Sequence, residues 1–99
     1  MNEFFNQLGI RWVEVVQRRG MRIEAPALDS EVALELLELA RVTAHTQERR
    51  FAPLSCYLAG IAAERLRAAK PETDSAAIAE LIREVRQELE KNFPTASER

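Results

Sequence analysis

The sequence predicts an all-α fold, a compact four-helix domain with an apolar third helix at its centre. Over four long stretches, apolar residues recur at intervals of three and four, the spacing of one helix face. Only 3 glycines and 4 prolines interrupt the chain, too few for a β-sheet protein with many tight turns. Residues 54–63, LSCYLAGIAA, contain no charge, so a helix there has no polar side to turn towards water.

Composition and charge indicate one globular domain over residues 1–99. The chain is 46% apolar and 30% charged, and a domain of this length buries about two thirds of its unfolded surface. A net charge of -2 argues against a nucleic-acid-binding module, which normally has a basic excess. The N-terminus lacks the features of a signal peptide, and no apolar run reaches the roughly 20 residues of a membrane span. We therefore expect a cytoplasmic domain.

The first helix is expected over residues 2–19. Gly9 lies inside its apolar stripe and predicts a place where another helix comes close. Gly20 is the expected stop, and residues 21–28, MRIEAPAL, are expected to form an extended connector without a partner strand. The stripe itself consists of Phe5, Leu8, Trp12, Val15 and Val16.

The second helix is expected over residues 30–48, with Asp29 as its N-cap. The solvent side of this helix is expected to hold its charged residues, and Leu34 and Val42 fall among them; they are Glu31, Glu35, Glu38, Arg41 and His45. Scattered exposed leucines are ordinary, and this is the interpretation we favour, but two on one face also fit a partner surface. The apolar face is expected to hold Val32, Ala33, Leu36, Leu37, Leu39, Ala40, Thr43 and Ala44.

The third and fourth helices are expected over residues 53–69 and 74–93. Pro53 suits the first turn of the third helix, and Pro71 prevents that helix from continuing. The short turn before Pro53 makes the second and third helices antiparallel neighbours. The polar tail over residues 95–99 is expected to fray. The fourth helix has an apolar stripe of Ile78, Leu81, Ile82, Val85, Leu89 and Phe93.

Four side chains around the end of the second helix form a candidate ligand site. Arg41, His45 and Arg49 follow at intervals of four residues, along one helix edge, and Arg50 comes next in the turn. Guanidinium groups match phosphates and carboxylates, so the stripe predicts a site for a small anionic ligand. The alternative, which charge patterns of this kind favour, is a solvated surface whose arginines pair with neighbouring glutamates.

No catalytic constellation and no metal site is predicted. Cys56 falls in the apolar half of the third helix, where a thiol is normally an inert small hydrophobe. His45 has only Glu48 well placed nearby, whereas a metal site needs three or four ligands. Because the chain contains neither a glycine-rich phosphate loop nor a nucleophile elbow, we expect no catalytic residue and no cofactor.

The stretch LARVTAHTQERRFAPLSCYLAG, residues 39–60, resembles a small bacterial helical domain of unknown function. That domain occurs alone or fused to proteins resembling molybdenum-cofactor guanylyltransferases, the enzymes that attach GMP to molybdopterin. The resemblance implies a biological setting and no catalytic residue, because the catalytic part of the fused proteins is a separate nucleotide-binding domain. It is carried by Leu39-Ala40-Arg41, Ala44-His45, Arg49, Ala52-Pro53-Leu54, Tyr57, Leu58 and Gly60.

These observations favour a non-catalytic accessory or protein-interaction module. The resemblance implies a link to molybdopterin guanine dinucleotide biosynthesis, with a guanylyltransferase or a molybdoenzyme as partner. The alternative function is a small anionic-ligand-binding domain that uses Arg41, His45, Arg49 and Arg50. A third hypothesis is self-association through Leu34, Val42 and any apolar surface that the first helix leaves open. Neither nucleic acid nor membrane is expected as a partner.

Overall fold

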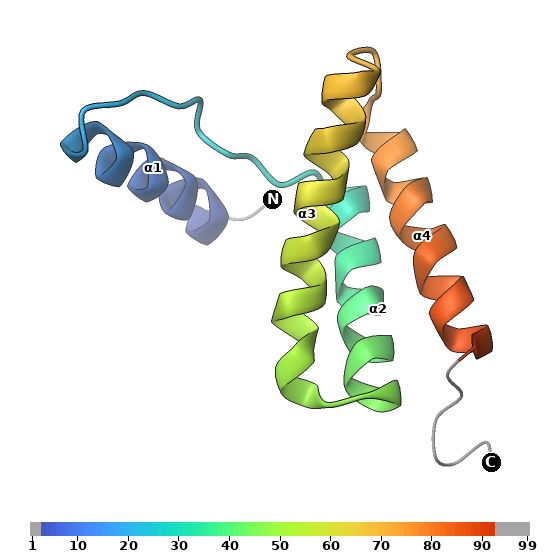
Figure 1. Cartoon of the computed structure of the whole chain (residues 1–99). Helices are drawn as coiled ribbons and strands as arrows, with labels where there is room; N and C mark the ends of the chain where they lie inside the picture. Colours follow the sequence, from blue (N-terminus) through green and yellow to red (C-terminus); the bar gives the residue numbers. More distant parts are fainter. Residues whose placement is uncertain (1–2, 93–99) are drawn as a thin grey trace. The chain divides into compact units, whose positions relative to one another are not determined.

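The computed structural model describes residues 3–92 and is all-α over this range (Figure 1). It confirms the predicted class, and each helix boundary lies within two residues of its predicted position. Position 2, Phe93 and the tail over residues 95–99 lie outside the described residues. The elements are α1 (Glu3–Arg18), α2 (Ser30–Thr46), the 3-10 turn η1 (Arg49–Phe51), α3 (Ala52–Ala69) and α4 (Ser75–Asn92).

The chain divides into two compact units, Met1–Ser30 and Glu31–Arg99. The first contains α1 and the connector that follows it, and the second contains nearly all of α2 together with η1, α3 and α4. That residues 1–99 form a single domain stays a prediction. None of the helices within residues 3–92 is long and apolar enough to cross a membrane.

In the first unit, α1 ends in a left-handed turn at Gly20, as its sequence predicts. Gly20 has a φ of 84°, which costs glycine nothing because it has no Cβ. The amide of Met21 donates to the carbonyl of Val16 at 3.2 Å, and the amide of Gly20 donates to that of Gln17 at 2.9 Å. These two bonds form a Schellman motif, which satisfies the last carbonyls of the helix and reverses the chain.

The reversed connector, and not another helix, accounts for Gly9. Gly9 is buried, and a Cβ at this position would lie 2.6 Å from the carbonyl oxygen of Pro26. Only glycine permits such an approach of backbone to backbone. The connector therefore covers the side of α1 on which Gly9 lies. The opposite edge of the apolar stripe stays open, with Leu8 and Trp12 41% and 55% exposed.

In the second unit, α2 and α3 are antiparallel neighbours joined by the short turn through η1, and α4 runs along α2 (Figure 1). Helix α4 begins with a side-chain cap, because the carboxylate of Asp74 accepts a hydrogen bond from the amide of Ala77 at 2.9 Å. The core of the unit is a buried cluster to which all three helices contribute: Leu39, Ala63, Ile78 and Ile82.

The structure corrects one part of the predicted fold, the enclosure of the third helix. Only Ala63 of α3 is buried, whereas Leu54, Tyr57 and Leu58 are 61%, 72% and 67% exposed. Helices α2 and α4 cover the side of α3 that holds small residues such as Ala59 and Ala63. Absence of charge was therefore a poor guide to burial. Within this unit α2 is the central helix, with four buried residues and contacts to both neighbours.

Candidate functional site

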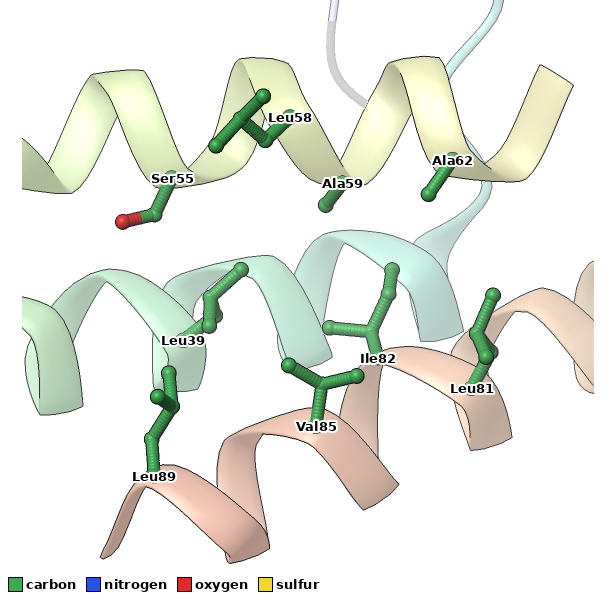
Figure 2. Close-up of a pocket in the computed structure, with 9 residues that line it drawn as sticks. All are labelled: Leu39, Ser55, Leu58, Ala59, Ala62, Leu81, Ile82, Val85 and Leu89. Carbon is green, nitrogen blue, oxygen red and sulfur yellow. The ribbon is translucent and has the colours of Figure 1, made fainter. Parts of the chain in front are cut away.

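The second unit has an apolar groove between α3 and α4, with Leu39 of α2 at its floor (Figure 2). Its volume is about 280 Å³. Eight of its nine lining residues are apolar, and α3 and α4 contribute most of them. We call this hollow the α3/α4 groove; it is lined by Leu39, Ser55, Leu58, Ala59, Ala62, Leu81, Ile82, Val85 and Leu89.

A mismatch in side-chain size between the two walls creates the groove. On the α3 wall, Ala59 and Ala62 have short side chains, while α4 presents larger ones such as Leu81 and Val85 (Figure 2). Interdigitated helices normally fill such space with side chains from both sides. Here the α3 wall contributes too little volume, so Val85 stays 48% exposed although it lies in the middle of an apolar stripe.

The groove continues past Leu58 and Leu89 into a second hollow of about 450 Å³ near the start of α3. Thr46, Phe51 and Leu54 line this part, and Ser55 lies at the junction of the two hollows. The two hollows share Ser55, Leu58 and Leu89 and follow one another along α3.

The few polar groups of the groove are satisfied within the chain. The hydroxyl of Ser55 lies 2.9 Å from that of Thr43 and donates to the carbonyl of Phe51 at 3.1 Å. Cys56 lies beside the groove wall, and its thiol contacts the carbonyl oxygen of Leu36 at 3.6 Å. Burial raises the pKa of the Cys56 thiol, which disfavours the nucleophilic thiolate. The groove therefore offers apolar contact area and no reactive group.

An acidic edge borders the groove on α4. Glu84 and Glu88 are both exposed, and they follow the groove residues Leu81 and Val85 by three positions, which places them along the margin of this stripe on α4. Neither of them forms an ion pair with another residue in the range 3–92. The exposed apolar side chains Leu54 and Leu58 border the opposite edge, on α3. The groove thus has one acidic edge and one apolar edge.

The other side of α4 is closed against α2 by ion pairs centred on Glu35. Arg83 and Arg86 approach the Glu35 carboxylate at 3.0 and 3.2 Å, and Arg86 also pairs with Glu90 at 2.9 Å. The side chains of Glu35 and Arg86 are only 13% and 15% exposed. Burial opposes the charge on Glu35, but the hydrogen bonds and charges of the two arginines outweigh it and lower the pKa of Glu35.

The same balance holds for Arg86. Burial opposes its charge, whereas the hydrogen bonds and charges of Glu35 and Glu90 raise the pKa of Arg86. Its Nε atom is buried without a hydrogen-bond partner, so the guanidinium is tied at its two terminal nitrogens only. This arrangement is a structural contact between α2 and α4, and none of its residues lines the α3/α4 groove.

The four residues of the predicted anion site lie on or just after α2, and they are exposed. Arg41 pairs with Glu38 at 3.2 Å and with Glu90 at 3.8 Å. These two carboxylate contacts leave less of the charge of Arg41 for a ligand. His45 lies one turn beyond Arg41 on α2, outside the groove.

The other two members of that site lie in η1. Arg50 pairs with Glu48 at 3.0 Å, and its guanidinium lies 5.8 Å from the centre of the Phe51 ring. Arg49 is exposed and forms no ion pair with another described residue. The anion site stays a prediction, and the contacts of Arg41 and Arg50 match the solvated charged surface that was its alternative.

The surface predicted for self-association on α2 is only half present. Leu34 is 64% exposed, but Val42 is 2% exposed and belongs to the buried side of α2. Leu37, which was assigned to the apolar face, is 66% exposed. Glu35 faces α4, and Val42 lies two turns further along the same side of α2. The buried side of α2 therefore includes both residues.

Among the described residues, no group of three or more His, Cys, Asp or Glu side chains comes together in a metal-binding arrangement. Sequence reasoning missed the α3/α4 groove, although a signal for it was present. Small residues recur on one face of the third helix at Ser55, Ala59 and Ala62, and large ones on the adjacent face at Leu54 and Leu58. A helix that packs through its small face leaves its large face for another partner.

Comparison with known proteins identifies a family without an assigned activity. No curated protein and no solved structure shows significant similarity to this chain. One family model matches residues 6–96, which include α2, α3, α4 and most of α1. This match shows no link to molybdenum-cofactor enzymes. The chain belongs to the family described as Domain of unknown function (DUF6457).

Proposed function

We propose that this chain is a non-catalytic interaction module that binds an amphipathic helix of a partner protein in the α3/α4 groove. The observation that carries the proposal is a groove with eight apolar residues among nine, bordered by the exposed side chains of Leu54 and Leu58. Exposed apolar surface that is continuous in this way marks interaction sites in globular proteins.

The shape of the groove favours a helix over a small molecule. From Leu81 to Leu89 the α4 wall spans about 12 Å at 1.5 Å per residue, which is about two helical turns of an occupant. Helices that bind in grooves use anchors spaced three, four and seven residues apart, which fit such a length. A small-molecule site needs a few unsatisfied polar groups to orient its ligand, and the hydroxyls of Ser55 and Thr43 are already paired with each other.

The charge of the groove edge specifies the occupant further. Glu84 and Glu88 border the groove without an ion partner in the described chain, so an occupant with Lys or Arg along one margin of its apolar stripe complements them. A helix with acidic residues on that margin places like charges together and binds more weakly.

The resemblance of residues 39–60 to the domain fused to molybdenum-cofactor guanylyltransferase-like proteins supplies a candidate source of this helix. Under this part of the proposal, the partner is a guanylyltransferase of that pathway or a molybdoenzyme. It rests on the resemblance alone, and it is tested separately from the groove.

Two synthetic 18-residue helices test the groove directly. Both have the same leucine stripe, one with lysines on a margin and the other with glutamates, and fluorescence anisotropy gives their affinities. We expect the lysine peptide to bind more tightly, with the difference shrinking in Glu84→Gln/Glu88→Gln and at high salt. Leu58→Glu should weaken binding of the lysine peptide at least tenfold. Equal binding to the wild type and Leu58→Glu contradicts the proposal.

Leu34→Glu is the matched control for Leu58→Glu. Leu34 is 64% exposed and Leu58 67%, so either substitution has a small effect on folding, but Leu34 lies on α2 outside the groove. The Leu34→Glu chain should bind the lysine peptide as the wild type does.

The biological setting is tested by affinity capture from cells of the source organism with the wild type, Leu58→Glu and Leu34→Glu as baits. We expect a molybdenum-cofactor guanylyltransferase or a molybdoenzyme with the wild type and Leu34→Glu, and its loss with Leu58→Glu. Recovery of neither class of protein by the wild type removes the setting and leaves the groove proposal to the peptide experiment.

A further inference from the structure

We infer that the α3/α4 groove also binds α1 of a second copy of this chain, so that two copies exchange their first helices. The inference rests on the proposed function, since it requires a groove that accepts an amphipathic helix. It names an occupant whose features are all present in the sequence. Each copy then provides one helix and one groove, and the contact is made twice around a two-fold axis.

Helix α1 has a free apolar edge of the required kind. The connector covers α1 at Gly9 through the carbonyl of Pro26, and it leaves the other edge of the stripe in solvent. Phe4, Leu8 and Trp12 on that edge are 64%, 41% and 55% exposed. They are four residues apart, the spacing with which groove-binding helices place their anchors.

The margin next to this free edge is basic. Arg11 follows Leu8 by three residues and precedes Val15 by four, and Arg18 follows Val15 by three, so both arginines lie along the same margin. Arg18 forms no ion pair within residues 3–92, and Arg11 has only an exposed contact of 3.5 Å with Glu14. An exposed pair of that kind contributes at most about 1 kcal/mol and exchanges readily for another partner.

The groove offers the complementary pattern. Its apolar lining spans about two turns of α4, and Leu8 and Trp12 are one turn apart on α1. Glu84 and Glu88 are also one turn apart along the margin of this lining, where they match a helix whose basic margin lies beside its apolar edge. The connector between α1 and α2 contains 11 residues, 19–29, and it folds back along α1 as far as Pro26. Helix α1 therefore binds the second molecule together with this part of its connector.

The single tryptophan of the chain makes the exchange visible. Trp12 lies on the proposed contact edge and is the only tryptophan present, so all indole fluorescence reports on α1. We expect the full-length chain to form dimers across the micromolar range in sedimentation velocity, with a blue shift of the emission as the concentration rises. A strict monomer with a spectrum independent of concentration overturns the inference.

Mixing two variants tests whether the helix is exchanged. Trp12→Glu disables α1 and keeps the groove, whereas Leu58→Glu disables the groove and keeps α1. Each variant alone should be monomeric. An equimolar mixture should recover dimers, because the intact α1 of the Leu58→Glu chain binds the intact groove of the Trp12→Glu chain. A dimer that instead joins two grooves face to face gives no such recovery, and lack of recovery overturns the inference.

Controls separate this inference from the proposed function. Ile10→Glu changes an exposed apolar residue on the other face of α1, and Leu34→Glu one on α2; both variants should dimerise as the wild type does. The lysine-margin peptide should convert wild-type dimers into monomers by competing for the groove. If the peptide binds but the chain never dimerises, the exchange is wrong and the groove proposal stands. If neither occurs, both are wrong.

Discussion

Helix α4 packs differently against its two neighbours. Its apolar and charged side chains fill the contact with α2, whereas α3 presents small side chains to it and a groove remains between them. On the α2 side, Ile78 and Ile82 are 2% and 5% exposed, and Arg86 fixes Glu35 at the edge. On the α3 side, Val85 is 48% exposed although it is only three residues from Ile82. The two sides of one helix show that an apolar stripe becomes core only where the neighbouring helix supplies matching volume.

The largest expected effect concerns the residue at which the two sides of α4 meet. Ile82→Ala should lower the free energy of unfolding by about 2–5 kcal/mol, because it leaves a cavity in the buried cluster. Val85→Ala removes an apolar side chain from the groove side and should cost less than about 1 kcal/mol. Urea denaturation of both variants checks the difference, and equal losses would mean that the groove side is packed like a core.

The next largest effect on stability should come from Arg86, on the side of α4 that packs against α2. Arg86→Met leaves the partly buried Glu35 carboxylate with Arg83 alone, and we expect a loss of about 1–3 kcal/mol in the free energy of unfolding. Arg83→Met is the matched control, since Arg83 contacts the same carboxylate but its side chain is 43% exposed, against 15% for Arg86. A larger loss for Arg83→Met would contradict the view that burial gives this contact its strength.

The ion pairs of Glu35 should also make the free energy of unfolding depend on pH. The folded state lowers the pKa of Glu35 below its ordinary value of 4.5, so the stabilisation is present above that pH and is lost as the pH falls through the folded value. The difference in unfolding free energy between the wild type and Glu35→Gln should therefore be greatest near neutral pH and should narrow as the pH falls below 4.5. Denaturation at a series of pH values tests this, and a constant difference would exclude Glu35 as the titrating group.

The smallest expected effect comes from filling the open side. Ala62→Leu adds three carbon atoms to the α3 wall opposite Leu81 and Val85, and we expect a gain in stability of less than about 1 kcal/mol because the groove stays partly open to water. The same variant should weaken binding of the lysine-margin peptide. A marked loss of stability would show that α3 and α4 leave no usable space between them.

Periodicity in the sequence was sufficient to predict the helices. The stripes at intervals of three and four placed all four of them, and Gly20 and Asp74 marked the end of α1 and the start of α4. The arrangement around each helix was harder to predict. The uncharged run of α3 was expected to be enclosed, yet Tyr57 is 72% exposed, because burial depends on which neighbours lie against a helix and not on its own composition.

The orientation of α2 was hidden for a related reason. Glu35 was expected on the solvent side, but it pairs with Arg83 and Arg86, which are 48 and 51 residues away along the chain. A single sequence contains no signal for pairing over such a separation. This pairing turns the helix so that Val42 becomes buried and Leu37 becomes exposed. The groove itself was predictable only from the alternation of small and large residues along α3.

Cys56 gives this chain a natural probe of its own fluctuations. It is the only cysteine, and its thiol lies against the carbonyl of Leu36, where burial keeps it protonated. The thiol is partly buried and its pKa is raised, so an alkylating reagent such as iodoacetamide should react more slowly with the closed pair of helices than with a pair that has separated. The labelling rate at fixed pH thus reports on the opening of α2 and α3 in the unaltered protein, without any engineered label.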